Sequence, residues 1–150
     1  MPEVVSVSGS ENPLALPPVI AGANTPEIER RVENFFHLVA AIFEAWVNRR
    51  KSDHTRRAYR GDVMAFAEFR GWAWPKDSAM LLRASILDVQ AFKDHMGKLG
   101  VAPKASNRRI SSLSSFYRFL SGAAAELRLP ITVPNPAYAQ FIARESSARR

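Results

Sequence analysis

The stretch from Ser106 to Leu120 reads SNRRISSLSSFYRFL and combines two different faces at helical spacing. Apolar residues recur every three or four positions, which places them on one side of an α-helix; they are Ile110, Leu113, Phe116, Tyr117 and Leu120. The opposite side carries polar and basic groups, at Lys104, Asn107, Arg108, Ser111, Ser115 and Arg118. We therefore predict a helix over about 104–125 that packs on a core through one face and offers the other to a polar partner.

The same spacing predicts helices on both sides of this stretch. One begins at Thr25-Pro26-Glu27, an N-cap followed by proline and an acid, and continues as a single helix to about Arg50. A second spans about 55–70, a third runs from Ser85 to Gly100, and a short one contains Tyr138, Phe141 and Ile142. The expected buried residues of the first three are Ile28, Val32, Phe35, Val39, Ile42, Trp46, Tyr59, Val63, Phe66, Ile86, Val89, Phe92, Met96 and Leu99. No segment shows the period of two that strands require, so we expect an all-α, compact bundle of four main helices plus a short C-terminal helix.

The composition limits the classes of function. The chain has 150 residues, no cysteine and a net charge of +7, so disulfides, thiol catalysis and cysteine-bound zinc are excluded. Its three histidines are scattered, and we expect neither a metal site nor a cofactor. No segment has the basic start and apolar run of a secretory signal or the length of a membrane span, so we expect a cytoplasmic protein.

We expect three regions along the chain. Residues 1–25 are rich in proline, serine and glycine without a period, which is typical of a flexible tail. Residues 26–143 form the helical domain, and 144–150 begin a linker to a further domain.

The positive charge is concentrated in two segments. Arg49 to Arg60 contains six cations against Asp53, and Lys98 to Arg109 contains four cations and no acid. Helix N-termini and arginine side chains bind phosphates, and arginine and asparagine also read base edges. Five serines lie between positions 106 and 115, and small hydroxyl side chains allow close approach to a DNA backbone. We therefore predict a DNA-binding face rather than a merely solvated one.

Three motifs resemble the N-terminal core-binding, or SAM-like, domain of tyrosine recombinases (phage integrases). Residues 52–62 with Phe66 resemble its S-x-x-T-x-x-x-Y-x-x-D-x-x-x-F pattern, and Ser106 onward resembles T-x-N-R-R-L-S-x-L-R-x-F-Y, although Ser114 stands where that family often has arginine. Asn135-Pro136 resembles the Asn-Pro that leads out towards the catalytic domain. The resemblance covers roughly residues 28–145 and implies a bundle that clamps one face of double-stranded DNA.

The resemblance also implies which residues face DNA. Carried over position by position they are Thr55, Arg56, Lys104, Ser106, Asn107 and Arg108. The helical wheel adds Arg57, Arg60, Ser111 and Arg118. The family's catalytic residues lie in a separate C-terminal domain, so we expect this chain to have no catalytic site of its own; His54-Thr55-Arg56-Arg57 matches the catalytic H-x-x-R only in spelling. Members of the family act as tetramers on DNA, which implies self-association of the full-length protein.

Some alternatives stay open from sequence alone. The chain could instead be a stand-alone DNA-binding regulator or a helical protein-interaction module. Asp62 either pairs with an arginine such as Arg109 or lies in solvent. Tyr59, Tyr117 and Tyr138 are expected to pack in the core, while Trp72 and Trp74 either cover one end of it or contact a neighbouring protomer.

Overall fold

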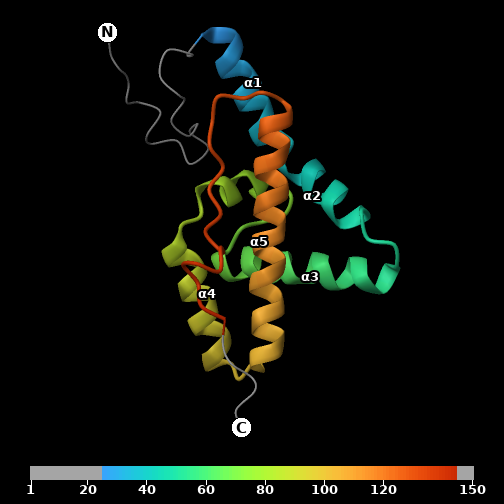
Figure 1. Cartoon of the computed structure of the whole chain (residues 1–150), viewed down its shortest axis with the longest axis vertical. Helices are drawn as coiled ribbons and strands as arrows, with labels where there is room; N and C mark the ends of the chain where they lie inside the picture. Colours follow the sequence, from blue (N-terminus) through green and yellow to red (C-terminus); the bar gives the residue numbers. More distant parts are fainter. Residues whose placement is uncertain (1–24, 145–150) are drawn as a thin grey trace.

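The computed structural model describes residues 25–144, and within that range it is all helical, as predicted (Figure 1). The α-helices are α1 (Pro26–His37), α2 (Val39–Asn48), α3 (Asp53–Arg70), α4 (Ile86–Lys98) and α5 (Pro103–Glu126). A 3₁₀ helix, η2 (Ser78–Arg83), connects α3 to α4 and was not predicted.

Side-chain caps define where three of the helices begin. The Oγ1 atom of Thr25 accepts a hydrogen bond from the Ile28 amide at 3.2 Å, and the Oγ atom of Ser52 accepts one from the Thr55 amide at 3.1 Å. Ser85 and Asp88 form a reciprocal capping box at the start of α4. The predicted starts at Thr25 and Ser85 are thus confirmed, and α3 begins slightly earlier than predicted.

The single helix predicted from Thr25 to Arg50 is wrong, because the helix is interrupted at Leu38. The amide of Leu38 bonds to the carbonyl of Phe35, three residues back, at 3.0 Å. This tighter turn changes the direction of the helix axis, and in Figure 1 α2 continues from the end of α1 at a different angle. Val32 and Phe35 before the break and Val39 and Trp46 after it are all buried, so the kink keeps one apolar stripe on the core.

Helix α5 is the central element, with α2, α3 and α4 packed against it (Figure 1). All five apolar residues predicted for its inner face are buried. The ring of Phe116 lies 5.4 Å from that of Phe43 and 5.3 Å from that of Trp46, and the hydroxyl of Tyr117 donates to the Leu81 carbonyl at 2.6 Å. An aromatic core therefore joins α2, η2 and α5.

The two tryptophans after α3 lie at the edge of this core. Trp72 packs edge-on against Phe66 at 5.6 Å, and Trp74 packs edge-on against Phe43 at 5.1 Å. Both side chains are partly buried, which agrees with the prediction that they cover one end of the core.

The prediction of a short C-terminal helix is wrong. Residues 136–142 form only isolated hydrogen-bonded turns, in which the amides of Phe141 and Ile142 both bond to the carbonyl of Tyr138. Tyr138 and Phe141 are 45% and 54% exposed instead of packed, while Ile142 is buried. Two further residues expected in the core, Ile86 and Leu99, are also exposed.

The segment after α5 runs back beside it towards its N-terminal end (Figure 1). The Asn135 Nδ2 atom donates to the carbonyl and the Oγ atom of Ser114, at 3.2 and 3.0 Å, and its Oδ1 atom accepts from the Ala137 amide at 3.1 Å. Further along, the Nε atom of Arg144 donates to the Oγ atom of Ser111 at 3.3 Å. These contacts fix residues 135–144 against α5.

Candidate nucleic-acid interface

Helices α3 and α5, which carry the two basic segments, are joined where they cross. The carboxylate of Asp62 on α3 is 1% exposed. Its Oδ1 atom accepts from the Nη2 atom of Arg108 at 2.8 Å, and its Oδ2 atom accepts from the Oγ atom of Ser112 at 2.7 Å. Asp62 is thus buried and paired with Arg108, and the partner suggested from sequence, Arg109, instead contacts the sulfur of Met96.

Three of the predicted DNA-facing arginines have acidic partners. Besides Arg108, the Nη1 atom of Arg56 bonds to Asp53 at 2.8 Å, and Arg60 bonds to both carboxylate oxygens of Glu44, at 2.6 and 2.7 Å. The hydrogen bonds from Arg60 lower the pKa of Glu44 and raise that of Arg60. Each acid offsets one positive charge, so the face is less positive than a count of its cations suggests.

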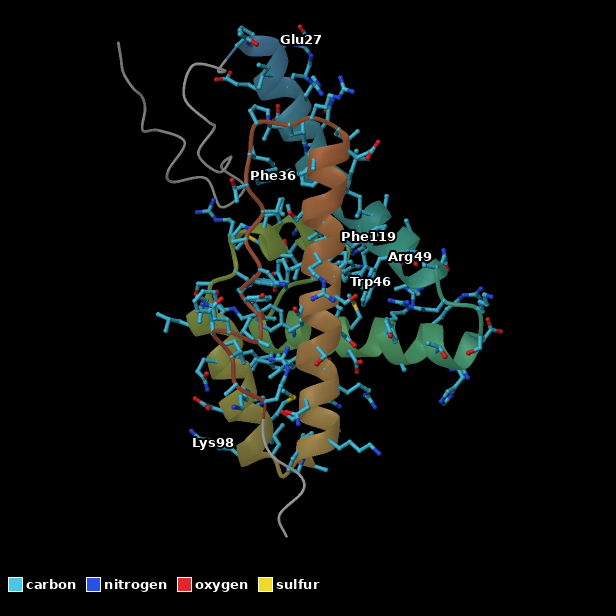
Figure 2. All side chains as sticks on the ribbon, viewed as in Figure 1. Glu27, Phe36, Trp46, Arg49, Lys98 and Phe119 are labelled. Carbon is cyan, nitrogen blue, oxygen red and sulfur yellow. The ribbon has the colours of Figure 1, made fainter. Side chains whose placement is uncertain are left out.

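Several exposed cations without an acidic partner lie near the starts of the two helices. Lys51, Arg57 and Lys104 are exposed, and none of them forms a hydrogen bond or ion pair with another residue of the described range. Lys51 precedes α3, Arg57 lies in its second turn, and Lys104 lies in the first turn of α5. Lys98, at the end of α4 and near the start of α5 (Figure 2), is exposed as well.

The other predicted residues differ in their exposure. Arg118 is exposed and donates to the Oγ atom of Ser114 at 3.1 Å, Asn107 is half-buried, and Ser111 is exposed but accepts from Arg144. Thr55 is half-buried, and its Oγ1 atom accepts from the Ser52 hydroxyl at 2.8 Å. Ser106 is only 4% exposed, so its hydroxyl is not on the surface that the lysines occupy.

Several serines of α5 have partners within the domain. Ser115 accepts from the Nε1 atom of Trp46 at 3.2 Å, Ser114 accepts from Asn135 at 3.0 Å, and Ser112 donates to Asp62. The interpretation that the small serine side chains allow close approach to DNA therefore does not apply to Ser114, which is 4% exposed. Ser112 lies four residues after Arg108, which is one helical turn; that spacing was the sequence signal for their shared partner.

Arginines stacked on aromatic rings were not predicted. The guanidinium of Arg49 lies 5.3 Å from the ring centre of Phe119, and that of Arg50 lies 4.2 Å from the ring centre of Tyr59. Figure 2 shows Arg49 at the end of α2 beside α5. Cation–π contacts hold a guanidinium in place without removing its charge, so these side chains add positive charge between α2 and the two basic helices.

The described range contains neither a membrane-spanning helix nor a cluster of metal ligands. No helix there is long and apolar enough to cross a membrane. No group of three or more histidine, aspartate or glutamate side chains between residues 25 and 144 is arranged to hold a metal ion.

Comparison with known proteins identifies relatives of this chain. The tyrosine recombinase XerD of Agrobacterium fabrum is 31% identical over 90 residues, which cover 60% of this chain and 24% of the relative. The tyrosine recombinase XerC of Xanthomonas campestris pv. campestris is 31% identical over 91 residues, which cover 56% of this chain and 27% of the relative. The chain thus spans about a quarter of the length of these curated relatives. No solved structure matches it.

A family model also matches the chain and assigns it to a domain family. The phage integrase N-terminal SAM-like domain matches residues 43–123. This stretch contains most of α2, all of α3, η2 and α4, and most of α5. Because the matched residues make up more than half of the chain and include both basic helices, the chain belongs to the family of phage integrase N-terminal SAM-like domains.

Proposed function

We propose that this domain binds double-stranded DNA as the core-binding part of a site-specific tyrosine recombinase. The observation that carries the proposal is a group of exposed cations near the starts of α3 and α5 that have no acidic partner in the described range, Lys51, Arg57 and Lys104. They lie near the starts of two helices that cross, and Asp62 and Arg108 hold the two helices together. The starts of α3 and α5 would then each contact a separate part of one DNA duplex.

The contacts in this proposal are mainly with phosphates. Arg57 and Lys104 supply the charge, and the first turn of α5 adds amide hydrogens that have no partner within the helix. Arg56, Arg60, Arg108, Ser111 and Arg118 remain candidate contacts, each with the partner described above. The half-buried Asn107 and Thr55, at the start of α3, are further candidates. We leave Ser106 out because it is buried.

We further propose that binding and cleavage are carried by separate domains of the whole protein. Residues 26–143 form the DNA-binding domain and 144–150 begin a linker, while strand cleavage belongs to a C-terminal domain outside this chain. The relatives are named tyrosine recombinases and the matched residues are about a quarter of their length, which supports a division into a binding part and a catalytic part. The full-length protein would assemble as a tetramer on DNA at the bacterial nucleoid.

Binding of a labelled duplex of about 30 base pairs tests the proposal through fluorescence anisotropy at two salt concentrations. Each phosphate that is neutralised makes the slope of log affinity against log salt more negative by about 0.9. We therefore expect the affinity to fall steeply between 50 and 200 mM salt. The variant Arg57→Glu/Lys104→Glu should lose most of the binding. Arg108 is avoided as a target, because a glutamate there would face the buried Asp62 carboxylate and destabilise the domain.

The matched control is Arg30→Glu/Lys76→Glu. It changes the net charge by the same amount at two exposed positions outside α3 and α5. It should retain most of the affinity. Equal losses in the two double variants would mean that only net charge matters, and absence of binding by the folded parent chain at low salt would overturn the proposal.

A further inference from the structure

Arg108 uses only one edge of its guanidinium group on Asp62. Its Nε atom lies 3.2 Å from both carboxylate oxygens and its Nη2 atom lies 2.8 Å from Oδ1. Both hydrogens of Nη1 and one of Nη2 are left free of the carboxylate. The side chain is 54% exposed, so a large part of it is accessible from solvent.

The pair between Arg60 and Glu44 has a different geometry. There both terminal nitrogens, Nη1 and Nη2, bond to the carboxylate. This edge is the one that a phosphate would meet at the tip of the side chain. In Arg60 this terminal edge is occupied by Glu44. In Arg108 the Asp62 carboxylate binds the edge formed by Nε and Nη2 and leaves Nη1 without a bond to it.

A buried acid at position 62 has an unfavourable charge for a DNA-binding surface. Burial of a carboxylate is costly unless it is paired and hydrogen-bonded, and apolar residues of similar size would often pack at least as well. The negative charge also lies beneath a face proposed to bind phosphates. The geometry of Arg108 offers a role for this carboxylate beyond joining α3 to α5.

We propose that Asp62 is a positioning residue for DNA binding, which holds the Arg108 side chain so that its free terminal edge meets a phosphate of the duplex. Ser112, by donating to the other carboxylate oxygen, fixes the orientation of Asp62. The long arginine side chain then loses little additional conformational freedom when DNA binds. This inference rests on the proposed DNA-binding function.

The substitution Asp62→Asn separates positioning from charge, because the two effects have opposite signs. Loss of a negative charge near the duplex would by itself tighten binding. Loss of positioning weakens binding, and we expect the affinity to fall about five- to tenfold, which corresponds to about 1–1.4 kcal/mol. The control Asp94→Asn removes the same charge from an exposed carboxylate on α4 whose hydrogen bond is to Gln90, and it should change the affinity by less than about twofold.

A double-mutant cycle with Arg108→Gln completes the test. If Asp62 acts through Arg108, Asp62→Asn should have almost no further effect on DNA affinity in the Arg108→Gln background. Anisotropy would be measured with the full 150-residue chain, below the unfolding temperature of each variant as followed by circular dichroism. The ¹⁵N–¹H signal of Arg108 Nε gives an independent readout, and we expect it to be sharp in the parent and broadened by faster exchange in Asp62→Asn.

Each outcome bears on the proposal. A weaker affinity in Asp62→Asn that disappears in the Arg108→Gln background supports it. Unchanged or tighter binding overturns it while leaving the DNA-binding function intact, and so does an equal loss in both backgrounds, which would assign Asp62 a general role in the fold. If the folded parent chain binds no duplex at all, the proposed function itself fails and the inference fails with it.

Discussion

Arg60 on α3 bonds through both terminal nitrogens to the carboxylate of Glu44 on α2, at 2.6 and 2.7 Å. The pair joins two helices that are connected by a short turn. Both side chains are 43% exposed, so water weakens the attraction, and the pair contributes at most about 1 kcal/mol to stability.

The pH dependence of this pair gives the first prediction. Because Arg60 lowers the pKa of Glu44 in the folded protein, the stabilisation is fully present above the unfolded pKa of glutamate, about 4.3, and is lost as the pH falls through the lower folded pKa. Glu44→Gln should reduce the free energy of unfolding by about 0.5 kcal/mol at pH 7. In urea titrations at decreasing pH, the difference from the parent should shrink below pH 4; a constant difference would contradict the pairing.

The second prediction concerns the buried hydroxyl of Tyr117. Tyr117→Phe leaves the carbonyl of Leu81 without its 2.6 Å hydrogen bond and should cost about 1–2 kcal/mol in urea denaturation. The control Tyr59→Phe removes a hydroxyl that has no hydrogen bond with the described residues, and it should cost less than about 0.5 kcal/mol. Similar costs for the two variants would count against the Tyr117 contact.

Tyr117 should also affect stability in alkaline solution. Burial raises the pKa of its hydroxyl well above the ordinary value, so ionisation favours the unfolded chain. The stability contribution is fully present below the unfolded tyrosine pKa, about 10, and falls as the pH rises above it. The parent should therefore lose more stability than Tyr117→Phe between pH 9 and pH 11, as measured by urea denaturation at each pH.

The third prediction compares the same substitution at two glycines. Gly61 lies within α3, and a Cβ atom added there meets nothing within 4 Å, so Gly61→Ala should stabilise the domain by about 0.5–1 kcal/mol. Gly71 ends α3 with a φ of 78°, in the left-handed region, so Gly71→Ala should destabilise it by about 1 kcal/mol. Thermal unfolding followed by circular dichroism would reveal the opposite shifts, and shifts of equal sign would contradict the assigned end of α3.

The fourth prediction concerns Asn135, whose side chain joins the segment after α5 to Ser114. Asn135→Ala removes two donated bonds and one accepted bond and should cost about 1–3 kcal/mol. Hydrogen exchange at the amides of Tyr138, Phe141 and Ile142 should accelerate, while exchange in α3 stays close to that of the parent. The control Thr132→Ala changes an exposed residue of the same segment and should leave the exchange at these amides unchanged.

The helices were predictable from sequence because their signals are local. Ser85 with Asp88 defines a helix start within four residues, and the spacing from Ile110 to Leu120 defines a buried face within one helix. The break at Leu38 was not predictable in this way, because the apolar stripe continues through it without a change of spacing. The short C-terminal helix was wrong because apolar residues at helical spacing also occur in turns that are anchored by only one of them, Ile142.

The geometry of the candidate site was less predictable, because it depends on contacts between distant residues. Asp62 and Arg108 are 46 positions apart, and the one-turn spacing of Arg108 and Ser112 indicates a shared partner without identifying it as Asp62. Sequence also gives the number of cations but not which of them have acidic partners. Arg57 and Lys104 differ from Arg60 in this respect only once the helices are packed.

The serines of α5 determine how this helix can form. Serine is a weaker helix former than alanine, leucine or lysine, and Ser112, Ser114 and Ser115 bond to α3, to the segment after α5 and to α2. A peptide of residues 103–126 would lack all of these partners and should show little helicity in water. The central helix therefore cannot act as a preformed template for its neighbours, and the domain should acquire its secondary and tertiary structure in a single cooperative folding transition.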